Sequence, residues 1–506
     1  MSKEAFDTLL SRVRTVGDVA GAAALLGWDQ RTHMPPRGTA VRSERLATLA
    51  TIAHEMMTSD EVGELIANSE DYVKGLGDES FEAGLWRHVK RRYDKTKLIP
   101  PELTAAMQRA GSAGYTAWMK ARAESDYSQF REALQHNLDL AKEMVDALRS
   151  YFPDAEEDYD ILLDDYEPGM KTSDIARVFD ELKLATKDLL AKVVENHDEK
   201  RDAILHGHFP ADKQEELTRI VLKQIGFTDD AFNLATTTHP FESSMAINDI
   251  RITTKYEEDY FNPSFFGTMH EFGHGLYEHQ ISEKYERTPL ARGTSMAWHE
   301  SQSRMMENLV GRGRPFWDWA MPQVKNVFPQ QFADVSADDM YRAVNAMGPS
   351  HIRIEADELT YNLHIILRFE LERDLLSGAV TTADLPEAWN TKFREYFGID
   401  VPNDAQGVLQ DVHWSQGSLG YFPTYALGNV LASMLWKRIN AEIPSLEQDL
   451  SAGDLSGLRA WLGDNIHQHG SFYLPMDLME KVLGVRQLDA KPLIAYLTQK
   501  VDELYG

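Results

Sequence analysis

The sequence predicts a mainly α-helical protein with one small β-sheet. Apolar residues recur at helical spacing along most of the chain, as in Leu9, Val13 and Val16. A single stretch, residues 249–256, alternates with period two instead. No internal repeat or low-complexity linker divides the 506 residues. We therefore expect one domain over residues 1–506, built as one compact unit or as two helical lobes.

The composition narrows the classes of function. There are 80 acidic and 52 basic side chains, for a formal net charge of −28. Such a surface repels nucleic acid and anionic membranes, because phosphate binding requires clustered lysine and arginine. The chain has no cysteine, which excludes disulfides, thiolate nucleophiles and cysteine-bound metals. A metal ion would need histidine and carboxylate ligands.

The first residues of the sequence are not expected to act as an export signal. Residues 1–16 lack a basic segment followed by an apolar stretch, and the apolar run from Val19 to Trp28 is too short to span a bilayer. The absence of cysteine also fits a reducing compartment. We therefore expect a cytoplasmic protein that does not insert into membranes.

The first half of the chain is expected to form successive helices up to about residue 225. After a first helix, prolines and a glycine interrupt the pattern in a predicted turn at residues 28–38, and residues 46–53 then resume it. A pair of prolines, Pro100 and Pro101, marks a second break and the start of another helix.

Residues 249–256 are predicted to form a β-strand. Ile250, Ile252 and Thr254, all of them β-branched, alternate with polar residues across residues 249–256. A short strand in a helical protein usually belongs to a small sheet. The free edge of that sheet either binds an extended peptide or has only a structural role.

Three further helices are predicted beyond the strand. Asn262, as N-cap, and Pro263, as the first helical residue, begin the first of them. The second covers residues 350–376, beginning after Pro349, and the third covers residues 424–441.

The first of these helices contains His270-Glu271-Phe272-Gly273-His274. Residues four apart lie one turn apart on the same helix face, so the two imidazoles can bind one cation. Glu271 projects beside them, where its carboxylate can accept a proton from a metal-bound water. This arrangement predicts His270 and His274 as zinc ligands and Glu271 as the general base of a hydrolase. The alternative is two histidines that share a helix face without a metal.

A catalytic zinc needs a third protein ligand and an open position for water. No third histidine follows at a suitable spacing, so we expect a carboxylate from a later helix. Glu300 is the predicted ligand, and Glu307, two turns further on, is the alternative. Arg304 occupies the position where an acid often orients a zinc histidine. Asp249 is a candidate for that orienting role.

Hydrolysis of a peptide also needs a donor for the oxyanion of the tetrahedral intermediate. Residues 407–425 are rich in glycine, and are expected to form a loop that approaches a ligand closely. This segment offers His413, Tyr421 and Tyr425, and tyrosine and histidine are the usual donors at such sites. The alternative for each of these side chains is ordinary packing.

Five motifs follow one another along the chain: Asp249-x-Arg251-x-Thr253, His270-Glu271-x-x-His274, His299-Glu300-Ser301-Gln302, Ile352-Arg353-x-x-Ala356-Asp357 and Gly407-x-x-Gln410-Asp411-x-His413-Trp414. In these motifs the sequence resembles the carboxypeptidase Taq family of metallocarboxypeptidases. The same resemblance extends to two more segments, Leu26-x-Trp28-Asp29-x-x-Thr32-x-Met34-Pro35 and His239-Pro240-Phe241. It covers nearly the whole chain.

The resemblance implies a neurolysin-like helical metallopeptidase fold, with a deep substrate channel and a small β-sheet beside the active site. It implies homodimers that release single C-terminal residues from peptides with broad specificity, proline being disfavoured. It also implies zinc at His270, His274 and Glu300 and a general base at Glu271. Some members of the family work with cobalt.

A carboxypeptidase must also bind the terminal carboxylate of its substrate. Arginine does this best, through two parallel hydrogen bonds. Arg353 is the predicted residue, held by Asp357 one turn later on the long helix and helped by Tyr421 or Tyr425. Arg251 is the second choice. A structural ion pair between Arg353 and Asp357 is the alternative.

Two other functions compete with this interpretation. One is an oligopeptidase or dipeptidyl carboxypeptidase with the same zinc chemistry. The other is a non-catalytic helical protein that only binds a metal, although the intact Glu271 speaks against it. In the favoured interpretation the partners are peptide substrates and a second copy of the chain, without nucleic acid or membrane.

Overall fold

Helices dominate the computed structural model, which describes residues 2–196 and 201–506. The predicted series up to residue 225 is confirmed, with a new helix beginning at Pro101. Its members are α1 (Ser2–Thr32), α2 (Thr39–Thr58), α3 (Asp60–Leu76), α4 (Phe81–Leu98), α5 (Pro101–Glu124), α6 (Arg131–Leu148), α7 (Asp158–Leu163), α8 (Thr172–Glu195) and α9 (Ala211–Ile225).

A three-stranded sheet follows α9. It consists of β1 (Phe232–Thr236), β2 (Glu242–Ala246) and β3 (Asp249–Thr254), in the order β1-β3-β2. β3 is the strand predicted at 249–256. It pairs in parallel with β1 and antiparallel with β2, so it is central and the free edges belong to its neighbours. Neither β1 nor β2 was expected from the sequence, because both are short and lack strict alternation.

The remaining helices complete the chain. They are α10 (Asn262–His279), α11 (Met296–Arg304), α12 (Arg314–Val327), α13 (Ala337–Val344), α14 (Tyr361–Ser377), α15 (Leu385–Phe397), α16 (Pro423–Glu442), α17 (Leu446–Ser451), α18 (Ser456–Asn465), α19 (Pro475–Leu483) and α20 (Lys491–Tyr505). None of the helices described here is long and apolar enough to cross a membrane.

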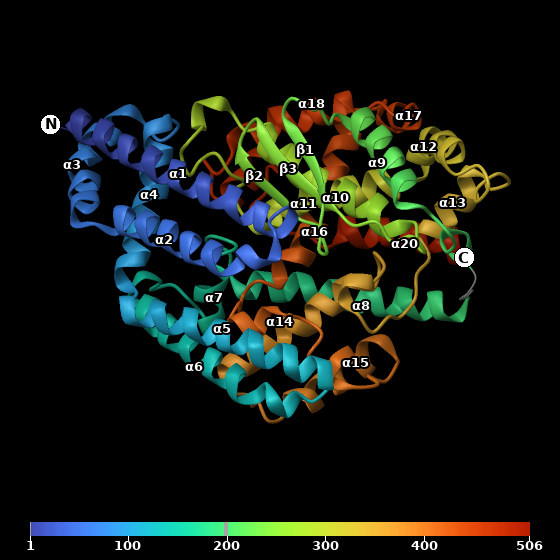
Figure 1. The fold of residues 1–506 in the computed structure, drawn as a ribbon, viewed down its shortest axis with the longest axis horizontal. Coiled ribbons are helices and arrows are strands. Elements are labelled where there is room, and N and C mark those ends of the chain that lie inside the picture. Colours follow the sequence, from blue (N-terminus) through green and yellow to red (C-terminus); the bar gives the residue numbers. More distant parts are fainter. Residues whose placement is uncertain (1, 197–200) are drawn as a thin grey trace.

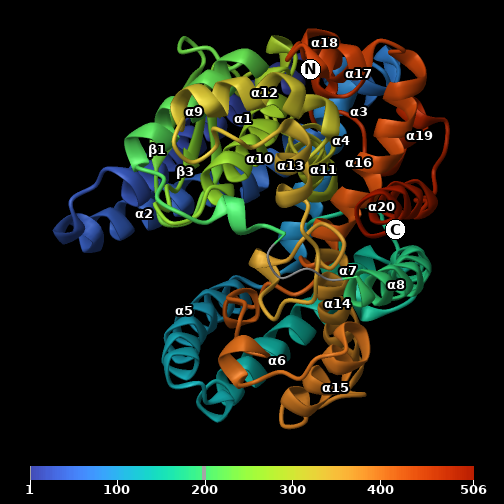
Figure 2. The ribbon, with the colours of Figure 1, turned by 90° about the vertical axis from the view of Figure 1, so that its right-hand side faces the viewer.

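The helices are arranged in two halves, which share one core. Figure 1 shows the sheet with α9 and α10 above α5, α6 and α14, and Figure 2 shows the same two halves from the side. Buried side chains join them in one cluster that includes Leu138 of α6, Phe272 of α10 and Leu431 of α16. Around α1, α3 and α4 a smaller second core forms, containing Leu9 and Val62.

The predicted helix at 350–376 is wrong at its beginning, because α14 starts only at Tyr361. Residues Arg353–Glu355 form a separate short turn. The Asp357 carboxylate accepts the backbone N–H groups of Leu359 and Thr360, at 2.9 and 3.0 Å. A side chain that binds nearby backbone donors in this way competes with helix formation across residues 357–360.

Two other boundaries differ from the prediction by a few residues. α1 extends to Thr32, so only the second part of the predicted turn at 28–38 is outside the helix. Arg42 of α2 stabilises this end of α1 by donating to the Leu26 carbonyl at 2.6 Å and to Asp29 at 2.7 Å. Asn262 is the first residue of α10 rather than its N-cap.

Candidate metal centre

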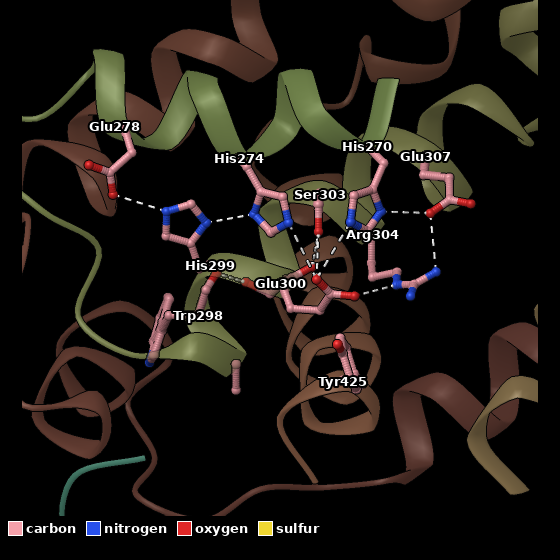
Figure 3. Close-up of polar contacts among 12 residues, drawn as sticks. His270, His274, Glu278, Trp298, His299, Glu300, Ser303, Arg304, Glu307 and Tyr425 are labelled. Carbon is pink, nitrogen blue, oxygen red and sulfur yellow. Dashed lines mark hydrogen bonds and ion pairs between the residues drawn. The ribbon is translucent and has the colours of Figure 1, made fainter. Parts of the chain in front are cut away.

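Two crossing helices form the candidate centre. α10 presents the His270 and His274 rings on one face, and Glu300 of α11 points toward both of them (Figure 3). α11 begins where the Ser295 side chain accepts the backbone N–H of Trp298 at 3.3 Å, an ordinary N-cap. Glu300 is therefore held on the second turn of a well-started helix.

The spacing of these three side chains fits one small cation. One ligand atom from each residue lies within 4.8 Å of the others. Oε2 of Glu300 lies 3.6 Å from Nε2 of His270 and 3.4 Å from Nε2 of His274. Tetrahedral zinc with bonds of about 2.0–2.1 Å places its ligand atoms about 3.4 Å apart. The two imidazoles are 17% and 16% exposed, so the centre opens toward solvent.

Two glycines allow the helices that carry the centre to approach closely. A Cβ atom on Gly273, between the two histidines, would lie 2.5 Å from the Gln302 carbonyl oxygen of α11. A Cβ atom on Gly428 of α16 would lie 2.5 Å from Cγ of Glu300. The middle of the motif therefore needs glycine for packing, not for backbone conformation.

Glu300 keeps its negative charge although it is buried. Burial alone would raise the pKa of its carboxyl group, but Arg304 and the two histidines outweigh this effect and hold the pKa well below its usual value. Arg304 donates to Oε1 at 2.7 Å, which leaves Oε2 directed toward the imidazoles. The residue four positions after the ligand thus orients the ligand itself.

Each imidazole contacts a partner through its other nitrogen. Nδ1 of His270 lies 2.9 Å from Oε2 of Glu307, and Nδ1 of His274 lies 2.5 Å from Nδ1 of His299. Glu307, the alternative ligand, contacts the far nitrogen of His270 and is not among the three residues whose ligand atoms converge. The Asp249 carboxylate contacts neither imidazole and pairs with Arg251 at 2.8 and 3.0 Å, which corrects its predicted orienting role.

Glu271 is buried beside the two histidines. Burial raises the pKa of its carboxyl group to about 7, and the nearby His270 only partly opposes this. A general base works best when its pKa lies near the working pH. The position of Glu271 beside the two imidazoles is thus suited to accepting and returning a proton.

The three predicted oxyanion donors lie together at the start of α16. Nε2 of His413 is 3.3 Å from the Tyr425 hydroxyl, and the rings of Tyr421 and Tyr425 are 5.2 Å apart. Burial raises the pKa of both tyrosines and lowers the pKa of His413 to about 4. At neutral pH the hydroxyls therefore keep their protons, and the imidazole is uncharged.

Arg353 is buried next to this aromatic group but is not held by Asp357, which corrects the predicted ion pair. Its Nε and one Nη donate to Oδ1 of Asp411 at 2.9 and 2.8 Å, and its other Nη donates to Tyr361 at 3.1 Å. Arg368 binds the second oxygen of the same carboxylate at 2.6 Å. Two guanidinium groups thus share one carboxylate, and the cluster retains one positive charge.

Arg251, the second choice for the substrate carboxylate, belongs to the sheet. Besides pairing with Asp249, its guanidinium lies over the Trp28 ring, 4.6 Å from the centroid. His299, Glu278 and Arg368 were not predicted as parts of either cluster. The sequence offered a signal only for His299, which directly precedes Glu300.

Comparison with known proteins extends over the whole chain. Residues 8–501 match the family model for carboxypeptidase Taq (M32) metallopeptidases. Thermostable carboxypeptidase 1 of Thermus thermophilus is 39% identical and aligns over 99% of both chains. Carboxypeptidase 1 of Bacillus subtilis is 37% identical over 99% of this chain and 98% of the relative. The solved structure of Pyrococcus furiosus carboxypeptidase has a TM-score of 0.94 at 34% identity, covering 98% of this chain and 99% of that one.

Proposed function

This chain belongs to the carboxypeptidase Taq (M32) family of metallopeptidases and is a carboxypeptidase, and we propose that it uses zinc bound by His270, His274 and Glu300. The observation that carries this proposal is the convergence of two Nε2 atoms on Oε2 of Glu300, at 3.6 and 3.4 Å. Both Nδ1 atoms face other partners, which leaves the Nε2 atoms for the ion.

Zinc bound there would supply an activated water and polarise the scissile carbonyl. Glu271 takes the proton from the attacking water and passes it to the leaving amine, for which its position between the two histidines on α10 is suited. We assign stabilisation of the oxyanion to the protonated hydroxyls of Tyr421 and Tyr425, with His413 acting directly or through Tyr425.

For the terminal carboxylate we propose Arg353. The support is electrostatic: the cluster of Arg353, Arg368 and Asp411 keeps one positive charge while the neighbouring His413 is neutral. The Arg353 guanidinium lies 5.0 Å from the centroid of the Tyr425 ring, which connects this charge to the proposed oxyanion donors. A peptide whose C-terminus reaches this charge would place its last peptide bond near the zinc.

Several finer properties are proposed from the family resemblance. They are release of single C-terminal residues with broad specificity, poor release of proline, replacement of zinc by cobalt, a homodimer, and a cytoplasmic location. The acidic composition supports peptides rather than nucleic acid as partners.

One experiment tests both the metal and the base. Glu271→Gln should bind zinc in the same ratio as the wild type, because Glu271 is not a ligand, and should lose about 10²–10⁴-fold in turnover. Glu283→Gln, which changes an exposed acid just beyond α10, is the matched control and should behave as the wild type does. Zinc is measured by elemental analysis and turnover by mass spectrometry of peptide products.

The substrates in this assay are paired peptides with a free and an amidated C-terminus. We expect single residues to be released from the free form and none from the amide. Internal cleavage of the amide would favour an oligopeptidase, and release of dipeptides would favour a dipeptidyl carboxypeptidase. Normal turnover by Glu271→Gln would exclude the proposed mechanism.

A further inference from the structure

A chain of polar contacts leads from His274 back to its own helix. His274 contacts Nδ1 of His299, and Nε2 of His299 lies 2.9 Å from Oε1 of Glu278 (Figure 3). Glu278 stands four residues after His274 on α10, whereas His299 comes from α11. The series of contacts therefore passes from α10 to α11 and back to α10.

One arrangement of donors and acceptors along these contacts leaves His274 able to bind a cation. Oε1 of Glu278 also accepts the backbone N–H of Gly293 at 2.8 Å, which marks it as an acceptor. Nε2 of His299 must then carry a proton and donate it to Glu278. A cation at the centre needs the lone pair on Nε2 of His274, so Nδ1 of His274 must carry the proton and donate it across the 2.5 Å contact to Nδ1 of His299. Nε2 of His274 is left with a free lone pair facing Glu300.

The His299 ring is also fixed in place by packing. Its centroid lies 5.4 Å from that of Tyr277, and a Cβ atom on Gly293 would lie 2.8 Å from its Cδ2. Glu278 is buried as well. A ring confined in this way holds its partner in one orientation.

We propose that His299 and Glu278 are positioning residues for the metal centre, which hold His274 in the orientation and tautomer that a cation requires. The Glu307 carboxylate contacts His270 directly. The Glu278 carboxylate reaches His274 only indirectly, through the imidazole of His299. The inference rests on the proposed zinc binding, and adds that zinc affinity depends on His299.

Three substitutions of His299, to Ala, Asn and Gln, separate its contact with His274 from its contact with Glu278. The Asn side-chain oxygen can replace Nδ1 and accept from His274, whereas the Gln side-chain nitrogen can replace Nε2 and donate only to Glu278. His299→Ala and His299→Gln should weaken zinc binding by about 10–100-fold. His299→Asn should retain more of the affinity than either. Glu278→Gln, which removes the carboxylate that His299 contacts, should weaken zinc binding less than His299→Ala does.

Zinc affinity is measured on metal-free full-length protein by competition with a chromogenic chelator, beside the melting temperature of the same metal-free samples. His206→Asn, which alters an exposed histidine 3.2 Å from Asp202, is the control and should bind zinc as the wild type does. The inference is overturned if all His299 variants bind zinc as tightly as the wild type, even if their melting temperatures fall. Failure of the wild type itself to bind one zinc would instead refute the proposed function.

Discussion

Two buried glutamates show how the surroundings of a residue decide its charge. Glu300 faces Arg304 and two histidines, and these hold its pKa low despite burial. Glu167 lies at the start of α11, where Oε1 accepts the backbone N–H of Ala297 at 2.5 Å and Oε2 has no partner among the described residues. Burial without a neighbouring cation raises its pKa to about 8. The same residue type is thus charged beside Arg304 and two histidines, and protonated at neutral pH where no cation is near.

Glu167 should make stability depend on pH. Its pKa rises from an ordinary 4.5 to about 8 on folding, so between these values the folded protein keeps a proton that the unfolded chain releases. Stability therefore falls as pH rises through this window. Glu167→Gln imitates the protonated form and should remove the loss. Relative to the wild type, the variant should gain on the order of 1–4 kcal/mol of unfolding free energy between pH 5 and pH 8.

The measurement is urea unfolding of metal-free protein at both pH values. Glu64→Gln, at an exposed position of α3, is the control and should show no such gain. An equal difference between Glu167→Gln and the wild type at both pH values would mean that Glu167 is already charged in the folded protein.

At the scale of elements, the centre depends on close packing of α10, α11 and α16. Gly273 sits where the backbone of α11 touches α10, and Gly428 sits where α16 touches Glu300. Beyond Arg304 the chain continues as a π-helical segment, Met305–Gly311, which carries Glu307. Interruptions of this kind are often found at functional sites. Here the segment delivers the carboxylate that contacts His270.

Gly273→Ala should damage the centre without touching a ligand. The added methyl group would meet backbone atoms of Gln302 and Ser303 at 2.5 and 2.6 Å, and backbone cannot rotate away. α10 and α11 must then separate, which moves Glu300 away from the histidines. We expect at least about a 10-fold loss of zinc affinity, the lower range seen when the support of a metal site is disturbed.

Gly267→Ala is the matched control for this change. It lies on the same helix, and a Cβ atom there meets nothing within 4 Å. Alanine favours helix by up to about 1 kcal/mol over glycine, so this variant should bind zinc normally and be as stable as the wild type or more so. Equal zinc affinity in both variants would contradict the proposed role of the close contact.

At the scale of the whole molecule, the C-terminal helix braces the segment that carries Arg353. Lys500 of α20 donates to Glu358 at 2.8 Å, and the side chains are only 4% and 7% exposed. The Tyr505 hydroxyl accepts the backbone N–H of Met347 at 2.6 Å. The last turns of the chain therefore hold the loop between α13 and α14 in place. α20 and this loop are both distant in sequence from His270 and His274.

Lys500→Met should destabilise the whole protein. The substitution leaves the Glu358 carboxylate buried without its cation, and breaking a buried pair in this way costs about 3–5 kcal/mol. Adding Glu358→Gln removes the uncompensated charge and should recover part of the loss. Urea unfolding of the single and double variants measures the difference. A double variant no more stable than Lys500→Met would show that the lost cation is not the cause.

The sequence by itself determined the helical class, the central strand and the residue types of the metal centre. These follow from local rules: His270 and His274 share a face because they are four apart on a helix, and the absence of cysteine left carboxylates such as Glu300 to complete the set. Periodicity also placed α16 within one residue at each end.

Only the tertiary structure decided which side chains meet across elements. Arg353 pairs with Asp411, 58 positions away, instead of the nearby Asp357. His299 contacts Nδ1 of His274, and Glu307 contacts Nδ1 of His270. The physical reason is that periodicity fixes the face of a helix on which a residue lies, whereas partners between helices depend on how closely and at what angle the helices pack. In this protein glycines such as Gly273 set that distance.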